Sequence, residues 1–415
     1  MNDQTQPNSK NQQKIALVVI HGMGNQKPME TVRKLVQNLF PKKTGDKSTD
    51  QDKFSIYSAP ERASGSFDHR KLIAINDNYK FDCYEFYYAH LMSEPNTIKT
   101  ISWMLKLVFR SFSSKRLKYI IWLPIILSTA LLIGTYFLIY LYYGWLIGKL
   151  FQYNLILQPL ILLLPLFFIL IFKLFGSIFT TSFGDVIRYT VPHPENIKIR
   201  QEITNHGVEF LTNLHKEFNY EKIIVVGHSL GSIIAYEMLS NTFSNLNKQF
   251  DPYKHISNED EVHEINKVSL EDRVVLMKSY GWQWKITDFI TCGSPLAHAP
   301  MLLIDNYEQF KLKVDLREYP VCPPVEKDLS KLFYKSKNKY FPTHDSLFRY
   351  INWHNVYFTN DFIGGPLKKY FGKSINEVRI TPETYNKIPI SSHSKYWEKE
   401  KEPKAYQIIK NIIIQ

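Results

Sequence analysis

The chain has 415 residues, 44% of them apolar and 22% charged, with 51 Lys and Arg against 39 Asp and Glu. This composition excludes a disordered or collagen-like chain, and the length calls for two domains or one enlarged domain. The three cysteines are too few for a disulfide framework and lack metal-ligand spacing, which favours a reducing compartment. The net charge of +12 suits nucleic acid or an anionic membrane surface, so its distribution has to decide between them.

The first predicted elements are a polar tail and a buried strand. We expect residues 1–13 to be a disordered tail without a signal peptide, because only a short apolar run follows them. That run, KIALVVI at 14–20, is rich in β-branched residues and ends in a glycine-rich turn, which is typical of a strand buried on both faces. A helix over 29–40 and an aromatic-rich strand over 81–91 follow, within a predicted N-terminal domain part at 14–110.

Two charge-free runs come next. Residues 119–148 and 150–172 contain no charged side chain, and a helix needs about 20 apolar residues to cross a bilayer core. Long helices of soluble proteins usually carry a polar stripe. We therefore expect a transmembrane hairpin at 111–176, with spans at about 119–142 and 155–175, and with Tyr and Trp residues near the water–lipid boundary.

Basic residues flank these runs on both sides. The connecting stretch holds only Lys149, whereas the flanks contain Lys99, Lys106, Arg110, Lys115, Arg116, Lys118, Lys173, Arg188, Lys198 and Arg200. Since Lys and Arg resist translocation, this pattern predicts that both flanks are cytosolic and that the hairpin tip faces the other side. No Asp or Glu occurs from 95 to 184, so the region should attract anionic lipid headgroups. Nucleic acid is the weaker explanation, because no DNA- or RNA-binding motif accompanies the charge.

Helix and strand patterns alternate again over 177–415, the predicted C-terminal part of the folded domain. A helical pattern is expected at 199–218 and a strand followed by a helix at 222–239, with later strand candidates at 285–297, 354–362 and 377–382. The polar stretch 241–285 is expected to be an excursion over the sheet, with the solvated charge run NEDEVHE. This order predicts an α/β fold with a mainly parallel sheet flanked by helices.

The strongest chemical signal is Gly227-His228-Ser229-Leu230-Gly231. It lies between a predicted strand and a predicted helix, which is the setting of a nucleophile elbow. Small residues on either side of the serine allow a sharp turn, and the helix N-terminus favours developing negative charge on the projecting hydroxyl. The alternative is a tight turn in a nucleotide-binding fold, but neither phosphate-binding glycine motif occurs.

Two more motifs end predicted strands, HGMGNQ at 21–26 and GSPL at 293–296. Together with the elbow, they resemble the serine lipase and esterase branch of the α/β-hydrolase family over 14–90 and 180–400. The resemblance implies an α/β-hydrolase fold, into which the predicted two-helix transmembrane segment is inserted. It also implies a Ser-acid-His triad in that chain order, and no cofactor or metal.

The same resemblance implies an oxyanion hole. One N–H would come from Leu230, directly after Ser229, and a second from the loop after the first strand, with Met23 as the expected donor. His21, Gly22 and Gly24 would shape that loop. The alternative is an ordinary glycine turn in which His21 only packs.

The resemblance also assigns the remaining triad members downstream of Ser229. Asp361, just past the strand candidate, is the expected acid, and His393, in a late loop, is the expected base. Asp288 precedes a strand instead of following one, and Asp345 lies before the strand candidate at 354–362, so both are worse placed. His344 and His354 precede Asp361, which would break the expected chain order. The alternatives are a capping aspartate and a surface histidine without a role.

These features together predict a membrane-anchored serine hydrolase that cleaves acyl esters through an acyl-enzyme, with both termini and the catalytic domain in the cytosol. A lipid-like ester is the expected substrate, because the enzyme would work beside the bilayer that dissolves it. Lipase, phospholipase, thioesterase and acyltransferase activities all stay open, as does the oligomeric state. The competing hypothesis is a non-catalytic hydrolase-fold scaffold at the membrane.

Overall fold

The computed structural model describes residues 12–24, 26–42, 53–61, 70–92, 194–216, 218–249, 256–304, 306–336, 338–361, 363–383 and 392–414, with further positions between 63 and 68, 130 and 144, and 185 and 191. The chain divides into two units. One comprises Met1–Met92 with Tyr189–Gln415, and the other is Ser93–Arg188, which contains the predicted hairpin 111–176.

Most of the predicted membrane hairpin lies outside the described residues. The structure describes the predicted span 119–142 only at positions from 130 onward, which are helical, and it describes none of 155–175. Among the residues that are described, no helix combines the length and the apolar character needed to cross a bilayer. Residues 1–11 of the predicted tail also lie outside the described part, whereas Gln13 already belongs to the first strand.

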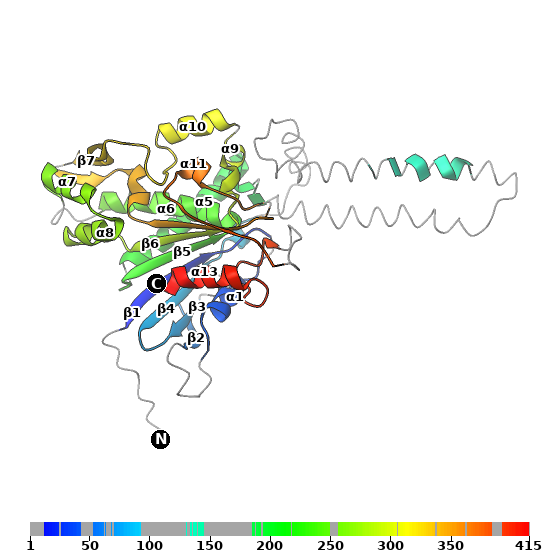
Figure 1. Cartoon of the computed structure of the whole chain (residues 1–415), viewed down its shortest axis with the longest axis horizontal. Coiled ribbons are helices and arrows are strands. Elements are labelled where there is room, and N and C mark those ends of the chain that lie inside the picture. Colours follow the sequence, from blue (N-terminus) through cyan, green and yellow to red (C-terminus); the bar gives the residue numbers. More distant parts are fainter. Residues whose placement is uncertain are drawn as a thin grey trace, which may run out of the picture. The chain divides into compact units, whose positions relative to one another are not determined.

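An eight-stranded sheet forms the centre of the first unit (Figure 1), in the order β10-β9-β6-β5-β1-β4-β3-β2. Its strands are β1 (Gln13–Ile20), β2 (Ser55–Pro60), β3 (Arg70–Ile75), β4 (Tyr79–Phe86), β5 (Lys222–His228), β6 (Ile286–Cys292), β9 (Asn352–Phe358) and β10 (Asn376–Ile380). Neighbours from β10 through to β4 run parallel, and the β2–β3 and β3–β4 pairs are antiparallel. The predicted α/β fold with a mainly parallel sheet is confirmed.

Helices cover both faces of this sheet. The helices α1 (Glu30–Leu39) and α13 (Pro403–Ile414) lie on one face, and α5 (Pro194–Lys216) and α6 (Leu230–Gln249) lie on the other (Figure 1). Ile15, Leu17 and Val19 of β1 pack into the core beneath α1 and α13, and the intervening side chains are buried on the opposite face. A strand buried on both faces must be apolar throughout, which explains the continuous apolar run in the sequence.

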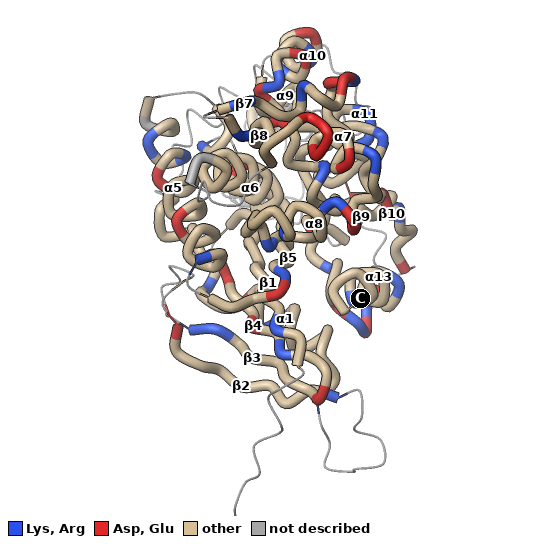
Figure 2. Tube along the Cα trace, turned by 90° about the vertical axis from the view of Figure 1, so that its left-hand side faces the viewer, with Lys and Arg blue, Asp and Glu red and all other residues tan. Residues whose placement is uncertain are grey.

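The predicted polar excursion contains regular structure. The helices α7 (Glu259–Lys267) and α8 (Leu270–Ser279) follow α6, and red segments of the backbone trace mark the acidic residues of α7 in Figure 2. Further along lie α9 (Ala299–Leu302), α10 (Tyr307–Asp315), the hairpin of β7 (Phe333–Ser336) and β8 (Lys339–Pro342), and α11 (Lys368–Phe371). Short 3₁₀ helices cover Ala89–Leu91, Pro295–His298, Leu329–Leu332 and His344–Arg349.

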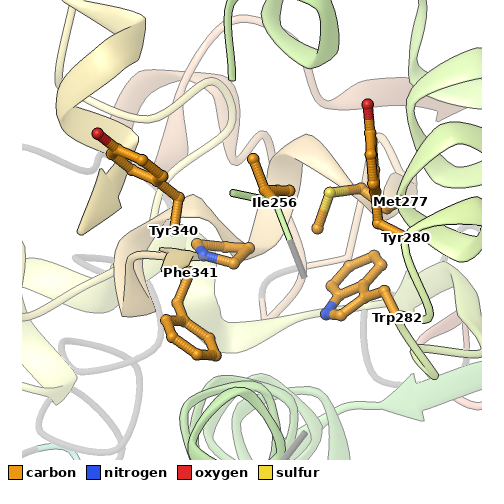
Figure 3. Close-up of a pocket in the computed structure, with 7 residues that line it drawn as sticks. Ile256, Met277, Tyr280, Trp282, Tyr340 and Phe341 are labelled. Carbon is orange, nitrogen blue, oxygen red and sulfur yellow. The ribbon is translucent and has the colours of Figure 1, made fainter. Parts of the chain in front are cut away.

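A small apolar hollow of about 10 Å³ lies beside α8 and β8 (Figure 3). It is lined by Ile256, Met277, Tyr280, Trp282, Tyr340, Phe341 and Pro342. Trp282 comes just before the amino end of β6, whereas Ser229 follows the carboxyl end of the parallel neighbour β5. The hollow therefore lies at the amino ends of the parallel strands, whereas the predicted nucleophile lies at their carboxyl ends.

Candidate active site

Ser229 occupies a sharp turn between β5 and α6. Its backbone φ is 51°, a left-handed conformation that a serine adopts only where its surroundings enforce it. A Cβ on Gly231 would lie 2.3 Å from the His21 carbonyl oxygen, so only glycine allows α6 to approach β1 this closely. This is the backbone arrangement that a nucleophile elbow requires.

Hydrogen bonds hold the strained serine in place from both sides. The Ser229 N–H donates to the Cys292 carbonyl oxygen at 3.0 Å, and the Ser232 hydroxyl donates to the Ser229 carbonyl oxygen at 2.6 Å. The residue is only 1% exposed, and its own hydroxyl is buried without a hydrogen-bond partner among the described residues. A buried, unpaired hydroxyl is uncommon and is left available for a reaction partner.

Asp361 and His393 form a direct pair. His393 Nδ1 lies 2.8 Å from Asp361 Oδ2, and Asp361 Oδ1 accepts the N–H groups of Ile363 at 2.9 Å and Gly364 at 3.0 Å. Burial alone would raise the pKa of Asp361, but the charge of His393 and the hydrogen bonds to the carboxylate outweigh it and hold this pKa below its ordinary value. Because an ionised carboxylate only accepts, Nδ1 of His393 must carry the proton.

The second ring nitrogen of His393 is consequently the basic one. His393 Nε2 is buried and, in the part of the chain that the structure describes, has no hydrogen-bond partner. The Asp361 side chain is fully buried and that of His393 is 13% exposed, so little water competes with their contact. An oriented imidazole with a free Nε2 can accept a proton from a neighbouring hydroxyl.

Gly293, which directly follows β6, lies against this pair. A Cβ placed on Gly293 would be 2.9 Å from Asp361 Oδ2 and 3.0 Å from His393 Cε1. The absence of a side chain at this position therefore makes room for the Asp361–His393 contact, and it accounts for the glycine of the motif at 293–296.

The elbow reaches the same loop through His228. Its Nε2–H donates to the His393 carbonyl oxygen at 2.8 Å, and the two imidazole centroids are 5.0 Å apart. Burial, followed by the nearby charge of His393, lowers the pKa of His228 to about 3, so this ring is neutral. The structure thus places the Asp361–His393 pair against His228, the chain neighbour of Ser229. Among the described residues, no hydrogen bond joins the Ser229 hydroxyl to His393 Nε2.

His21 clamps the loop that follows β1. Its ring stacks on Tyr88 with centroids 4.1 Å apart, its Nδ1–H donates to the Gly22 carbonyl oxygen at 2.7 Å, and its Nε2 accepts the Tyr88 N–H at 3.3 Å. The Tyr88 hydroxyl donates to the same Gly22 oxygen at 3.0 Å. Burial lowers the pKa of His21 to about 4, which keeps Nε2 free to accept. His21 therefore does more than pack.

This clamp orients the following peptide unit. In a trans peptide the C=O and N–H groups point in opposite directions, so the Met23 N–H points away from Tyr88. A Cβ on Gly22 would lie 3.1 Å from Ser229 Cβ, which places this loop against the serine. Leu230 begins α6, so its N–H has no intrahelical acceptor. Both predicted donors thus belong to segments that border Ser229.

The other candidates for acid and base have different partners. Asp288 Oδ1 lies 3.3 Å from His354 Nε2, within the sheet. Asp345 Oδ2 lies 3.8 Å from Arg317 Nε, and His344 Nε2 donates to the Arg317 carbonyl oxygen at 2.9 Å. None of these contacts involves Ser229.

Tyr88 and Tyr396 contact the site, although no sequence motif marked them. Tyr396 donates to Asp361 Oδ2 at 2.6 Å. Tyr88 reaches His21 across a separation of 67 residues. The sequence offered two indirect signals for these residues. Tyr88 lies in the aromatic-rich strand predicted at 81–91, and Tyr396 follows His393 by three residues.

Within the described residues, no group of His, Cys, Asp and Glu side chains is arranged to hold a metal ion. Comparison with known proteins gives no matching family model, no matching curated protein and no matching solved structure. The functional interpretation therefore depends on the residues of the site themselves.

Proposed function

We propose that this protein is a serine hydrolase of the α/β-hydrolase fold that cleaves acyl esters with Ser229, Asp361 and His393. The observation that carries the proposal is the 2.8 Å contact between His393 Nδ1 and Asp361, which fixes the imidazole with Nε2 free. The left-handed serine at the end of a central parallel strand adds independent support.

In the proposed reaction, His393 Nε2 removes the proton of Ser229 while the serine oxygen attacks the ester carbonyl carbon. Asp361 stabilises the imidazolium, and the N–H groups of Met23 and Leu230 hold the oxyanion. When the tetrahedral intermediate collapses, the alcohol leaves with the proton from His393. Water, activated by the same imidazole, then attacks the acyl-enzyme and releases the acid.

We further propose that a two-span hairpin, at about 119–142 and 155–175, anchors the catalytic unit on the cytosolic side. The charge-free runs and their basic flanks support it. The packing of Gly22 against Ser229 adds a topological argument, since one residue precedes the hairpin and the other follows it. Any membrane crossings between these two residues must therefore be even in number. A catalytic unit anchored in this way would lie beside esters dissolved in the bilayer, which makes them the expected substrates.

A fluorophosphonate probe, which labels activated serines, tests the catalytic proposal. Wild type should be labelled and Ser229→Ala should not. Ser240→Ala is a matched control, because Ser240 lies on the same helix α6 and its hydroxyl donates to the Tyr236 carbonyl oxygen within that helix. A folded but unlabelled wild type would favour the scaffold hypothesis, and labelling that survives Ser229→Ala would exclude this nucleophile.

Cysteine accessibility tests the anchor. In sealed vesicles with the cytosolic side outward, a membrane-impermeant maleimide should label Lys373→Cys directly and Lys149→Cys only after detergent is added. The three native cysteines are buried and give little background. Equal labelling of both positions before detergent would contradict the two-span topology.

A further inference from the structure

Tyr396 shares an oxygen with the proposed catalytic base. Its hydroxyl donates to Asp361 Oδ2 at 2.6 Å, and His393 Nδ1 contacts that same oxygen at 2.8 Å. The Tyr396 hydroxyl also accepts the Phe358 N–H at 3.3 Å, which directs its proton toward the carboxylate. Burial and the charge of Asp361 raise the pKa of Tyr396 well above its ordinary value, so the phenol stays protonated.

The loop geometry makes this sharing rigid. The Lys395 N–H donates to the Ser392 carbonyl oxygen, and the resulting turn directs His393 and Tyr396 toward one carboxylate. The Tyr396 ring is fully buried and packs against Phe358, with centroids 4.5 Å apart. The phenol therefore links the loop of the base to strand β9.

We propose that Tyr396 is a positioning residue that limits the basicity of His393 by drawing negative charge on Asp361 Oδ2 toward its own hydroxyl. The inference rests on the proposed function. Two donors on one oxygen compete for its electron density, so each bond weakens the other. Without the phenol, Asp361 would stabilise the imidazolium more strongly, and the base would hold its proton to a higher pH.

Other titratable groups around the pair do not explain such an effect. His228 at the end of β5 and Cys292 at the end of β6 face the pair, and His21 lies beyond His228. Burial lowers the pKa of both histidines and raises that of the Cys292 thiol, so all three are neutral near pH 7. On the loop itself, Lys395 is paired with Glu398 at 2.8 Å.

The test compares Tyr396→Phe with Tyr236→Phe. Tyr236 is a matched control, because it is also buried and its hydroxyl donates to the Pro320 carbonyl oxygen at 2.8 Å, away from the triad. We expect the acidic limb of the fluorophosphonate labelling rate to shift upward by about half a pH unit in Tyr396→Phe, and not to move in the control. An unchanged or downward-shifted limb in Tyr396→Phe would overturn the inference.

A second measurement separates this inference from the proposed function. The titration midpoint of the His393 ring, followed by NMR with histidine-selective labelling and assigned through His393→Gln, should rise in Tyr396→Phe even if no probe reacts. An unlabelled wild type whose His393 midpoint rises in Tyr396→Phe would reject the catalytic proposal and retain the role of Tyr396. A labelled wild type whose His393 midpoint does not change in Tyr396→Phe would support the catalytic proposal and reject the role of Tyr396.

If Tyr396→Phe does not fold, a different substitution at the same position can test the proposal. Site-specific 3,5-difluorotyrosine at position 396 keeps the ring and strengthens the hydroxyl as a donor. It should lower the His393 midpoint, in the opposite direction to Tyr396→Phe. A purely structural role for Tyr396 predicts no shift with this residue, and that result would also overturn the proposal.

Discussion

Two aspartate–histidine contacts among the described residues invite comparison, one within strands β6 and β9 and one beyond the strands. Asp288 and His354 lie within the strands, 3.3 Å apart, with side chains 15% and 18% exposed. Asp361 follows β9, and His393 lies between β10 and α13; the two side chains are 2.8 Å apart and 0% and 13% exposed. Identical residue types therefore occupy two different environments.

The difference lies in what surrounds each carboxylate. Asp361 Oδ1 accepts two backbone N–H groups from the turn after β9, whereas Asp288 Oδ2 accepts only the Thr287 hydroxyl, at 2.7 Å, among its side-chain contacts in the described part of the chain. Inside a sheet, backbone N–H groups are used by the ladder, but beyond the carboxyl ends of parallel strands the loops release them. Position along the strand therefore favours the Asp361–His393 pair as the proposed catalytic pair.

Replacing His393 and His354 in turn should give the largest difference in kcat between the two pairs. His393→Ala removes the proposed base and should lower kcat by about 10⁶, as expected for loss of a triad histidine. His354→Ala should leave kcat within about threefold. The measurement is turnover of an acyl ester in detergent micelles, with folding checked by circular dichroism. Comparable losses in both variants would mean that the 2.8 Å contact has no special catalytic role.

Replacing Asp361 and Asp288 in turn should give a smaller difference in kcat than replacing the histidines. In Asp361→Asn the amide can donate toward His393 Nδ1, which favours the tautomer with the proton on Nε2 and disables the base. We expect a loss in kcat of about 10⁴ without loss of fold. Asp288→Asn is the matched control and should retain nearly full turnover. Near-normal rates in Asp361→Asn would show that another carboxylate serves as the acid.

The turn between β5 and α6 could be predicted because its signal is local. Strand β5, Ser229 and the start of α6 are consecutive in the chain, so spacing alone reveals the turn. The positions of Asp361 and His393 required the chain order of a known family in addition. The bond from His228 to the His393 carbonyl spans 165 residues, and no local pattern announces such a contact.

The missed helix α7 has a different cause. Its charged residues suggested a solvated loop, but Asn258 and Glu261 form a capping box that starts the helix. Val262 and Ile265, three residues apart, are buried on its inner face. Strands β2 and β3 were also missed, because they lie at the sheet edge, where partial exposure removes the continuous apolar run seen in β1.

His228 offers a finer test of how the proposed catalytic pair is held. His228→Leu removes the N–H donor to the His393 carbonyl, which should loosen the base and lower kcat about tenfold, the effect of about one hydrogen bond. His228→Gln retains a donor and should recover part of the loss. The ratio of the two kcat values is the readout. Equal activities in the Leu and Gln variants would show that the ring acts through packing alone.

A third buried carboxylate shows what the histidine contributes. Glu85 is fully buried like Asp361, and its Oε1 accepts the Thr31 N–H at 3.2 Å at the start of α1. Within the described residues, no His, Lys or Arg side chain is hydrogen-bonded to it. Burial raises the pKa of Glu85 to about 7, although backbone hydrogen bonds from the start of α1 oppose the shift. Burial with a cationic partner and burial without one thus move a carboxyl pKa in opposite directions.

The sign of this shift makes a stability prediction. Because the pKa of Glu85 is raised from 4.5 to about 7, its contribution to the free energy of unfolding is fully present below pH 4.5 and is lost as the pH rises through about 7. Glu85→Gln cannot ionise, so it should be more stable than wild type at pH 8 by at most about 3 kcal/mol, with little gain at pH 4.5. Thermal unfolding at both pH values measures the difference. If Glu85→Gln were less stable than wild type at pH 8, the ionised carboxylate would be the favoured form at the start of α1. Hydrogen bonds from backbone N–H groups would then be enough to stabilise a buried charge there without a histidine.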